Sequence, residues 1–478
     1  MSKTIQKRGR AGSFALASLL CVIAGFGAGA SAQGVGAAGD DFVADPYPST
    51  YTPRNSGPVV LVGATILDGI GGRIDAGEIV LRGGKVAAIG TGLERPAGAT
   101  VVDARGRWIT PGLIDVHTHF GTYTLPQTSL SETASDVTEY HKQDASPTWI
   151  EHGVRSADPA FSHALAAGVT TLQILPGSGV LFGGRSVVVK PIAAPTVAAM
   201  KFPDAPQGLK MACGDSPKDE VGHGGFNSRQ GLMAEVREKL IEAQEYREHG
   251  PRSGRAGSHD THGPHGPRQH RDFEKETLAA VLEGKIAVHV HCYRSDDMAR
   301  IIDLSREFGF RIAAFHHATE AYKIAPLLAR SGICVAGWPD WWGFKPEAED
   351  AIRENVAFVD AAGGCAMMHS DIPILSEHLN TEAAKAAAAG RRAGLSEPPE
   401  HVIRWITSNP AKALGLDDRI GKLTPGANAD VVLWSGDPFS VYSHVDGVYI
   451  DGALVFDRAH PPPPSDFELG RTITEGQP

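Results

Sequence analysis

The sequence predicts an α/β protein: a (β/α)8 TIM-like barrel with a small β-sandwich domain formed from both chain ends. Apolar strand-like runs alternate with helical stretches through the middle of the chain. Repeated strand-then-helix units imply parallel strands. Short alternating runs bounded by glycine turns occur near both ends, so we expect the ends to pair. At 478 residues the chain is long enough for one large domain and a smaller one.

The strands expected at the chain ends are short and alternating, and they cover Val59–Val62, Ala64–Leu67, Ile79–Leu81, Val86–Ile89, Ala429–Trp434 and Val448–Phe456. Between them, more continuously apolar runs predict buried strands at Val169–Ile174, Ser186–Val189, Leu209–Ala212, Ala287–His291, Arg311–Phe315 and Ala366–Met368. Helical patterns cover Gly231–Glu248, Phe273–Leu282, Met298–Phe308 and Leu379–Ala389. In a (β/α)8 barrel the active site lies at the C-terminal ends of the strands.

Composition and pattern divide the chain into segments. A basic start, an apolar run and a small-residue site at Ala30–Ala32 predict a signal peptide over residues 1–32, and hence a periplasmic or secreted protein. An extended lead-in (33–57), sandwich strands (58–110 and 416–460), the barrel (111–415) and a tail (461–478) follow. Residues 249–272 are rich in Pro, Gly, Arg and His, which favours a flexible insertion at the barrel mouth over a metal-collecting tract.

The overall composition excludes several classes of partner. The formal net charge is −10 and no basic field is present, so we expect a small-molecule substrate and no nucleic acid. Beyond residue 32 no run is apolar enough for stable membrane insertion, and homo-oligomerisation stays open. Four cysteines remain after cleavage, without a C-x-x-C pair, and we expect mostly buried thiols at Cys213, Cys292, Cys334 and Cys365.

Two histidines end an apolar run near the start of the predicted barrel. His117 and His119 are spaced i, i+2, so on a strand both imidazoles project to the same face. Both can therefore meet one metal ion at the strand's C-terminal end. Such a pair is weak evidence by itself, but later strands also end in candidate ligands.

Three of those later strands supply further ligands. His291 lies nearer its strand end than His289, which we expect to be a hydrogen-bonded core histidine. His316 and His317 are adjacent and face opposite ways, so only one of them is favoured. Asp371 follows the last inner strand and can bind a metal or accept a proton from water. Several imidazoles plus a carboxylate are typical of a catalytic site for zinc or a similar ion, which lowers the pKa of its water towards about 7.

With these residues in view, the chain resembles the amidohydrolase superfamily, in the branch similar to imidazolonepropionase and metal-dependent dipeptidases. The resemblance covers roughly residues 58–458 and is carried by the motifs Thr110–His119 (TPGLIDVHTH), His317–Glu320, Thr407–Gly415 and Gly421–Val432. It implies a (β/α)8 barrel with a β-sandwich built from both ends. It also implies that His117 and His119 are first-strand ligands, His291 the fifth-strand ligand, His317 the sixth-strand ligand, and Asp371 both ligand and general base.

The resemblance leaves the fourth-strand ligand open. Related two-metal enzymes place a carbamylated lysine there, and Lys210 fits that position. Asp215 offers a carboxylate instead and carries equal weight, and Lys190 is a weaker third candidate.

Other residues near the predicted barrel mouth have proposed supporting roles. Related deaminases carry a Glu at the position of Arg294. Arg294 and Tyr293 could instead bind a substrate carboxylate, although a surface arginine fits as well. Glu320 and His369 could orient the metal ligands, and Glu320 is also a candidate substrate-binding residue with Tyr293 and Arg294.

These observations predict a metal-dependent hydrolase of amide C–N bonds. The expected substrate is a dipeptide or an N-acyl amino acid, with Asp371 as general base and His317 helping to stabilise the oxyanion. One or two divalent ions are expected, with zinc as first choice. The alternatives are a cyclic amide or lactam hydrolase and a non-catalytic metal-binding barrel protein. No G-x-S-x-G motif is present to support a serine hydrolase.

Overall fold

The computed structural model describes residues 45–123, 125, 128–218, 227–249 and 271–461. The predicted signal peptide lies outside these ranges, as do most of the lead-in, the His-rich insertion and the tail.

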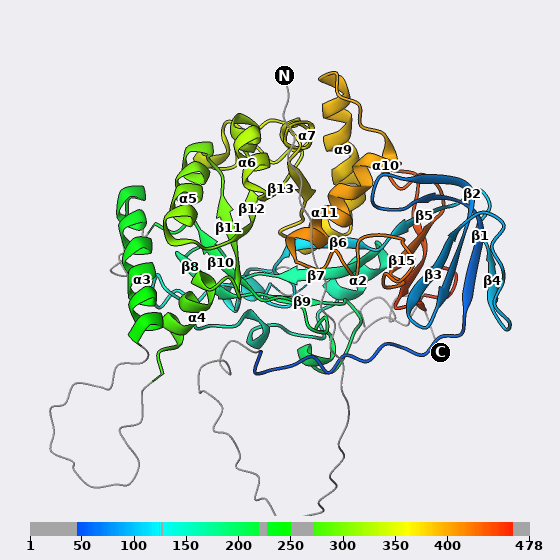
Figure 1. Ribbon diagram of the computed structural model, residues 1–478, viewed down its shortest axis with the longest axis horizontal. Coiled ribbons are helices and arrows are strands. Elements are labelled where there is room, and N and C mark those ends of the chain that lie inside the picture. The colour runs from blue at the N-terminus through cyan, green and yellow to red at the C-terminus, as the bar shows by residue number, and fades with distance from the viewer. Residues whose placement is uncertain (1–44, 124, 126–127, 219–226, 250–270, 462–478) are drawn as a thin grey trace, which may run out of the picture. The chain divides into compact units, whose positions relative to one another are not determined.

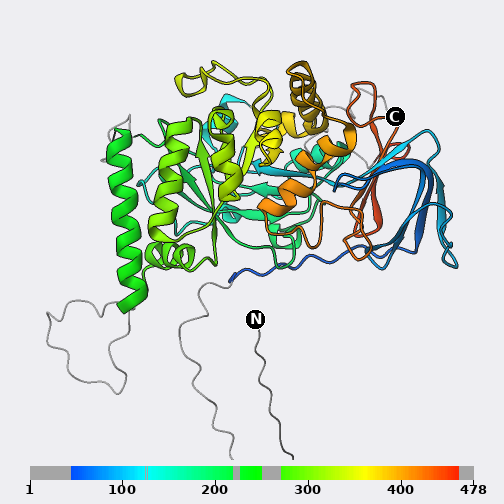
Figure 2. The ribbon, with the colours of Figure 1, turned by 45° about the horizontal axis from the view of Figure 1, so that its top comes forward.

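Strands from both ends of the chain form one eight-stranded sheet. Its strand order is β17-β16-β15-β5-β1-β2-β3, with β4 paired to β1. The strands are β1 (Val59–Leu67), β2 (Arg73–Arg82), β3 (Lys85–Gly90), β4 (Thr100–Asp103), β5 (Trp108–Pro111), β15 (Val431–Trp434), β16 (Val445–Ile450) and β17 (Ala453–Asp457). Both views show the blue N-terminal strands beside the red C-terminal strands (Figures 1 and 2). The two ends meet where β15 pairs antiparallel with β5.

One strand expected at the C-terminal end is a hairpin. The predicted run Val448–Phe456 is split into β16 and β17 at Asp451 and Gly452, which have φ values of 48° and 76°. Two successive residues with positive φ form the type I′ turn that Asp-Gly favours. The continuous strand prediction was wrong because it read the apolar residues and overlooked this turn signal.

The central strands form two further sheets, with orders β14-β13-β12-β11-β10-β8 and β6-β7-β9. Their bounds are β6 (Leu113–Thr118), β7 (Val169–Ile174), β8 (Phe182–Arg185), β9 (Val187–Val189), β10 (Gly208–Ala212), β11 (Ala287–Cys292), β12 (Ile312–His317), β13 (Cys334–Gly337) and β14 (Cys365–Met368). Strands β10 to β14 are parallel, as predicted, and so are β6 and β7. Strand β13 was not predicted, because its four residues carry little pattern.

The strand expected at Ser186–Val189 is not parallel to its neighbours. Strand β9 pairs antiparallel with β7, and β8 pairs antiparallel with β10. Residues 175–186, which include β8 and no helix, are all that separate β7 from β9, whereas a parallel crossover usually needs a longer connection with an α-helix. The described strands form mixed α/β sheets without a closed hydrogen-bonded ring. One backbone bond, from Asp371 N–H to the His117 carbonyl (2.9 Å), joins the end of β14 to β6.

Helices alternate with the parallel strands and pack beside them (Figure 1). They are α1 (Ser129–Thr133), α2 (Ala160–Ala166), α3 (Arg229–His249), α4 (Phe273–Leu282), α5 (Ser295–Phe308), α6 (Ala325–Ser331), α7 (Asn355–Ala361), α8 (Pro373–Ser376), α9 (Leu379–Arg392), α10 (Pro399–Val402) and α11 (Ser408–Ala413). Short 3-10 helices lie at η1 (Ile150–His152), η2 (Val197–Ala199), η3 (Ala321–Ile324), η4 (Pro346–Ala348) and η5 (Ile403–Ile406).

Helix α5 illustrates why these segments are helical. It buries Met298, Ile301 and Phe308 on one face and ends at Gly309, whose φ of 79° suits a left-handed cap. Across the part of the chain that the structure describes, no helix is long and apolar enough to cross a membrane.

The four cysteines among the described residues form two disulfides, so the prediction of mostly buried thiols at these positions was wrong. Cys213 pairs with Cys292 and Cys334 with Cys365, at Cα separations of 5.1 and 4.4 Å. Cys334 and Cys365 are register partners in β13 and β14, and Cys213 and Cys292 lie at the ends of adjacent strands. Wide spacing in the sequence gave no sign of these neighbours, because parallel strands bring together residues far apart in the chain.

Candidate active site

The two histidines at the end of β6 face one carboxylate. His117 Nε2 and His119 Nε2 lie 3.4 and 3.3 Å from the same oxygen, Oδ1 of Asp371. The other ring nitrogen of His119 lies 2.7 Å from the Leu175 carbonyl oxygen, which holds the ring in orientation. The side chain of Asp371 is 24% exposed, so part of it borders solvent.

A second group of imidazoles shares His117. One ring nitrogen from each of His117, His317 and His369 lies within 4.8 Å of the others, and all three side chains are buried. Four of their ring nitrogens have no hydrogen-bond partner among the described residues. They are both nitrogens of His369 and the Nδ1 atoms of His117 and His317. Buried nitrogens without partners are costly in a folded protein unless they bind something else. We call His117, His119, His317, His369 and Asp371 the strand-end cluster.

His291 lies beside this cluster, with its ring centroid 4.4 Å from that of His317. Its Nε2 lies 2.9 Å from the Ser216 hydroxyl oxygen. The neighbouring His289 lies between the Gln173 amide at 3.2 Å and His316 Nε2 at 3.1 Å. His289 and His316 thus form part of a buried hydrogen-bonded chain. Of the adjacent pair His316 and His317, it is His317 that belongs to the strand-end cluster.

The candidates for the fourth-strand position have different surroundings. Lys210 Nζ lies 3.4 Å from His117 Nε2 and donates to the Pro176 carbonyl at 2.8 Å. Asp215 instead accepts a hydrogen bond from Arg294 at 2.7 Å and pairs with Lys218. Lys190 pairs with Asp451 at 2.7 Å, and the structure does not bring it to the strand-end histidines. Of these candidates, the structure brings Lys210 to the strand-end histidines.

The expected substrate-binding residues are only partly available. Arg294 is held by Asp215, which leaves its guanidinium partly satisfied. Glu320 accepts hydrogen bonds from the backbone N–H and hydroxyl of Ser295 at the start of α5, and therefore lies at a helix terminus. The Tyr293 ring stacks on that of His317, with centroids 5.1 Å apart and an interplanar angle of 11°.

Burial shifts the pKa values of several histidines at the site and of Lys210. It is the main cause that lowers the pKa values of His117, His291 and His317 well below the usual range, so these imidazoles are neutral at pH 7. It also lowers the pKa of Lys210 to about 7, which the charge of Asp371 partly opposes. Neutral imidazole is the form that binds metal ions.

Asp371 behaves in the opposite way. Burial alone would raise its pKa, but the hydrogen bond from His119 and the charges of His119, His369 and Lys210 lower the pKa below its ordinary value. The carboxylate is therefore ionised at neutral pH. An anionic oxygen near the neutral imidazoles of His117 and His317 is a donor set that suits zinc or a similar divalent ion.

The backbone is left-handed at two cluster positions. His317 and Asp371 both have φ values of 68°, and Ala318 follows His317 at 40°. Non-glycine residues rarely adopt this region, and it concentrates at functional sites. This conformation turns each side chain sharply as its strand ends. Asp115, buried beneath the cluster, accepts hydrogen bonds from Ser370 N–H (3.2 Å) and His117 N–H (3.3 Å), tying the two strand ends together.

Comparison with known proteins identifies the family. The profile described as "Amidohydrolase family" matches residues 108–455. The chain belongs to the amidohydrolase family. It is thus an enzyme of the class that hydrolyses carbon–nitrogen bonds, and its similarity to amidohydrolase structures implies a TIM-barrel fold.

Individual relatives agree with the family assignment. The amidohydrolase tasK of Hapsidospora irregularis is 30% identical over 81% of this chain, although the chain spans only 41% of that protein. The imidazolonepropionase of Paracoccus denitrificans is 24% identical over 76% of this chain and 88% of its own length. The crystal structure of an amidohydrolase from Thermotoga maritima covers 84% of this chain and all of its own, with 32% identity and a TM-score of 0.73.

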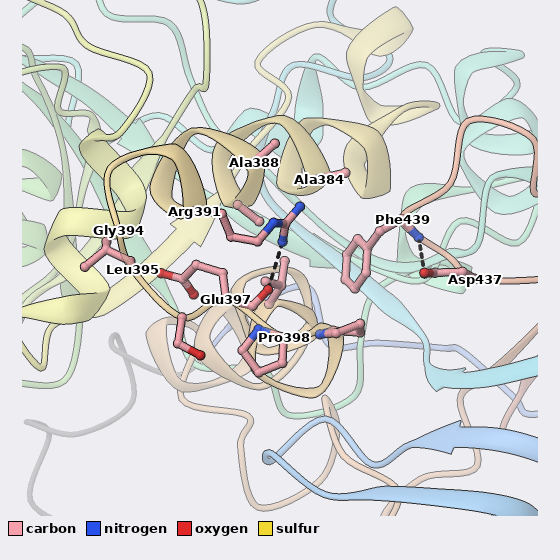
Figure 3. A pocket seen from close by; sticks show the side chains of 13 residues that line it. Ala384, Ala388, Arg391, Gly394, Leu395, Glu397, Pro398, Asp437 and Phe439 are labelled. Carbon is pink, nitrogen blue, oxygen red and sulfur yellow. Dashed lines mark hydrogen bonds between the residues drawn. The ribbon is translucent and has the colours of Figure 1, made fainter.

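This amidohydrolase has a further ligand-capable cluster on its outer helices. Three residues here each offer one atom that could bind a metal ion, and these atoms lie within 4.8 Å of one another. The residues are Asp360 at the end of α7, Glu397 before α10 and His401 in α10. We call these three residues the helix cluster. Glu397 also lines a cavity of about 860 Å³ between α9 and the loop carrying Phe439. Figure 3 shows Arg391 reaching from α9 to the Glu397 carbonyl, a 2.8 Å hydrogen bond.

Sequence reasoning underrated several residues near the site. His369 was assigned only an orienting role, yet it lies within the strand-end cluster. Ser216, Trp338 and Lys345 were not singled out at all. The signal for the last two was present as an aromatic-rich run, Trp338–Lys345, but the strand before it was not predicted.

Proposed function

We propose that this amidohydrolase is a metal-dependent hydrolase of amide bonds in dipeptides or N-acyl amino acids. The observation that carries the proposal is the meeting of His117 and His119 with Asp371 at one carboxylate oxygen, beside buried imidazoles without partners. That donor set fits one or two divalent ions, with zinc as first choice. Such ions would supply a water of lowered pKa and polarise the amide carbonyl.

The remaining chemistry belongs to the chain. His117, His119, His291, His317 and Asp371 would hold the metal. Asp371, ionised at neutral pH and partly bordering solvent, accepts the proton of the attacking water and returns it to the leaving amine. His317, turned towards the cluster, helps to stabilise the oxyanion. Lys210 would help to hold the ions as the carbamate that its neutral amine forms by adding carbon dioxide, and burial, which lowers its pKa to about 7, supports this because it favours the neutral amine.

Other features support the finer parts of the proposal. The backbone bond from Asp371 to His117 supports closure of the central strands into a barrel. The two disulfides support export to an oxidising compartment, because such bonds are rare in the cytosol. Similarity to imidazolonepropionase over most of that enzyme's length keeps a cyclic amide as the second candidate substrate.

The test is metal analysis joined to an amide hydrolysis assay. Purified protein should contain one or two divalent ions per chain and release amino acid from a dipeptide or N-acyl amino acid library. Removal of metal by a chelator should abolish hydrolysis, and zinc or manganese should restore it. Protein that neither holds metal nor gains activity on adding these ions would refute the proposal. Turnover of lactams alone would move it to the cyclic amide.

A further inference from the structure

A wall of aromatic side chains lies against the strand-end cluster. The ring centroid of Trp338 is 4.5 Å from that of His317 and 4.7 Å from that of His369. Trp341 stacks on Trp338 with centroids 5.1 Å apart, and Phe344 lies 6.2 Å from Tyr293. We call Tyr293, Trp338, Trp341 and Phe344 the aromatic wall. Trp338 contacts the imidazoles, and three of the four residues lie in the loop that follows β13.

The aromatic wall passes from the interior to solvent. Tyr293 and Trp338 are buried, Trp341 is half-buried, and Phe344 is 51% exposed. Exposed aromatic residues are common singly, but these rings are in mutual contact and continuous with the catalytic groups. A continuous apolar surface leading to reactive groups is what a substrate ring or large apolar side chain would cover.

One cation lies on this wall. Lys345 Nζ is 4.0 Å from the ring centroid of Tyr293 and donates to the Ser216 hydroxyl at 3.0 Å. The same hydroxyl oxygen is 2.9 Å from His291 Nε2. Lys345 also lies 3.5 Å from Glu347, so two of its three N–H donors have partners. A ligand carboxylate beside the Tyr293 ring would accept a hydrogen bond from the third N–H donor.

Arg294, the cation that the sequence suggested for this task, is placed less well. Its guanidinium is engaged by Asp215 at 2.7 Å, and Asp215 pairs with Lys218 as well. Lys345, by contrast, is linked to the candidate ligand His291 through one hydroxyl group. Since Lys345 is also paired with a carboxylate, that of Glu347 at 3.5 Å, it is the link to His291 through Ser216 that favours the ammonium as the group that meets a substrate anion.

We propose that Lys345 and the aromatic wall form the specificity subsite of this enzyme. The proposal rests on the hydrolytic function proposed above and narrows its substrate class. The substrate carries a free carboxylate, which Lys345 binds, and an aromatic or large apolar side chain, which packs against the wall. N-Acyl amino acids and dipeptides with a C-terminal aromatic residue meet both requirements.

The charge is tested with two substrates that share an amide and a ring, N-acetyl-phenylalanine and N-acetyl-phenethylamine, of which only the first has a carboxylate. The parent enzyme should prefer the first by at least about tenfold in kcat/KM, the scale of one charge-assisted hydrogen bond. Lys345→Met keeps the apolar stem and removes the charge, so this ratio should fall towards one. A ratio unchanged in Lys345→Met would overturn the assignment of Lys345.

The wall is tested at its exposed end, where truncation does not disturb the core. Phe344→Ala should lower the preference for N-acetyl-phenylalanine over N-acetyl-glycine by a few-fold. Trp342→Ala is the matched control, because Trp342 is 59% exposed and has no ring contact with the aromatic wall among the described residues. Equal effects of the two substitutions would argue against the wall as a substrate surface.

Direct binding separates this proposal from the proposed function. Calorimetry can measure N-acetyl-phenylalanine binding to Asp371→Asn protein, with and without Lys345→Met. Binding that depends on Lys345 without any hydrolysis by the parent enzyme would keep the subsite and reject the reaction. Hydrolysis that is indifferent to Lys345 and Phe344 would keep the reaction and reject the subsite.

Discussion

The strand-end cluster and the helix cluster contain the same kinds of residue, but they differ in how far these residues are already paired with each other. In the strand-end cluster, several buried ring nitrogens lack protein partners. In the helix cluster, Asp360 is already paired with His401, and Arg404 lies 3.7 Å away. Glu397 differs from Asp360 and His401, because one of its carboxylate oxygens is buried without a hydrogen-bond partner among the described residues and burial raises its pKa to about 7. A metal ion would therefore complete the first cluster but would compete with existing ion pairs in the second.

The position of each cluster in the fold agrees with this contrast. The strand-end cluster draws side chains from the C-terminal ends of different strands, where α/β barrels carry their catalytic groups. The helix cluster lies on the outer helices, where the ion pair between Asp360 and His401 joins α7 to α10. Proximity of ligand-type residues is thus a weak criterion, and unpaired ligand atoms at strand ends are a stronger one.

The comparison is tested most strongly by the same substitution in both clusters. Metal-loaded Asp371→Asn should lose at least about 10²-fold in kcat, because the amide cannot accept the proton of water. Asp360→Asn should stay within a few-fold of the parent enzyme in the same assay. Metal content must be measured on both proteins, so that loss of the ion is not mistaken for loss of the base.

A result within a few-fold for metal-loaded Asp371→Asn would remove Asp371 as the general base. His369, which lies in the same cluster, would then be the next group to examine.

Lys210 and Asp215 provide a second comparison within the site. Lys210→Ala should lower metal content by about tenfold or more, and bicarbonate with a short carboxylic acid should restore part of it. Asp215→Ala should change metal content little, because Asp215 is engaged by Arg294 and Lys218. Metal analysis by mass spectrometry distinguishes these outcomes, and the reverse pattern would transfer the bridging role to Asp215.

The smallest expected effect concerns Glu397 in the helix cluster. Burial, followed by the charge of Asp360, raises the pKa of Glu397 to about 7 from an ordinary value of 4.5. Below pH 4.5 both folded and unfolded states hold the proton. As the pH rises towards about 7, the unfolded state releases it more readily, so the free energy of unfolding declines and then levels off.

Glu397→Gln removes that pH-dependent loss. Its melting temperature should exceed that of the parent protein by roughly 2 °C at pH 8 and match it near pH 4.5. Calorimetric melts at the two pH values check the prediction. A stabilisation that is equal at both would mean that titration of Glu397 is not the cause.

The sequence predicted most of the strands because each is an unbroken apolar run between turn signals. Strand β7 and helix α4 have the predicted bounds. The same pattern led to His117, His119, His317 and Asp371, which the structure brings together because parallel strands end at one edge. Neither the direction of β8 and β9 nor the existence of β13 could be inferred, since both depend on pairing rather than on local pattern.

The remaining site contacts also depend on tertiary neighbours. Nothing in the sequence separates Lys210 from Asp215 until Arg294 is seen to face the latter. The disulfides and the position of Lys345 over Tyr293 likewise arise from residues distant along the chain. Local sequence thus indicates which residue types can do the chemistry, whereas the fold decides which of them meet.

The bond from Asp371 N–H to the His117 carbonyl has a consequence for how the enzyme comes into being. A chain is made from its N-terminus, so His117 and His119 emerge long before the segment that supplies the carboxylate. Until β14 docks beside β6, the growing polypeptide has histidines but no complete site. A chain that ends before β14 therefore keeps both histidines but lacks Asp371, the carboxylate that they face in the folded protein.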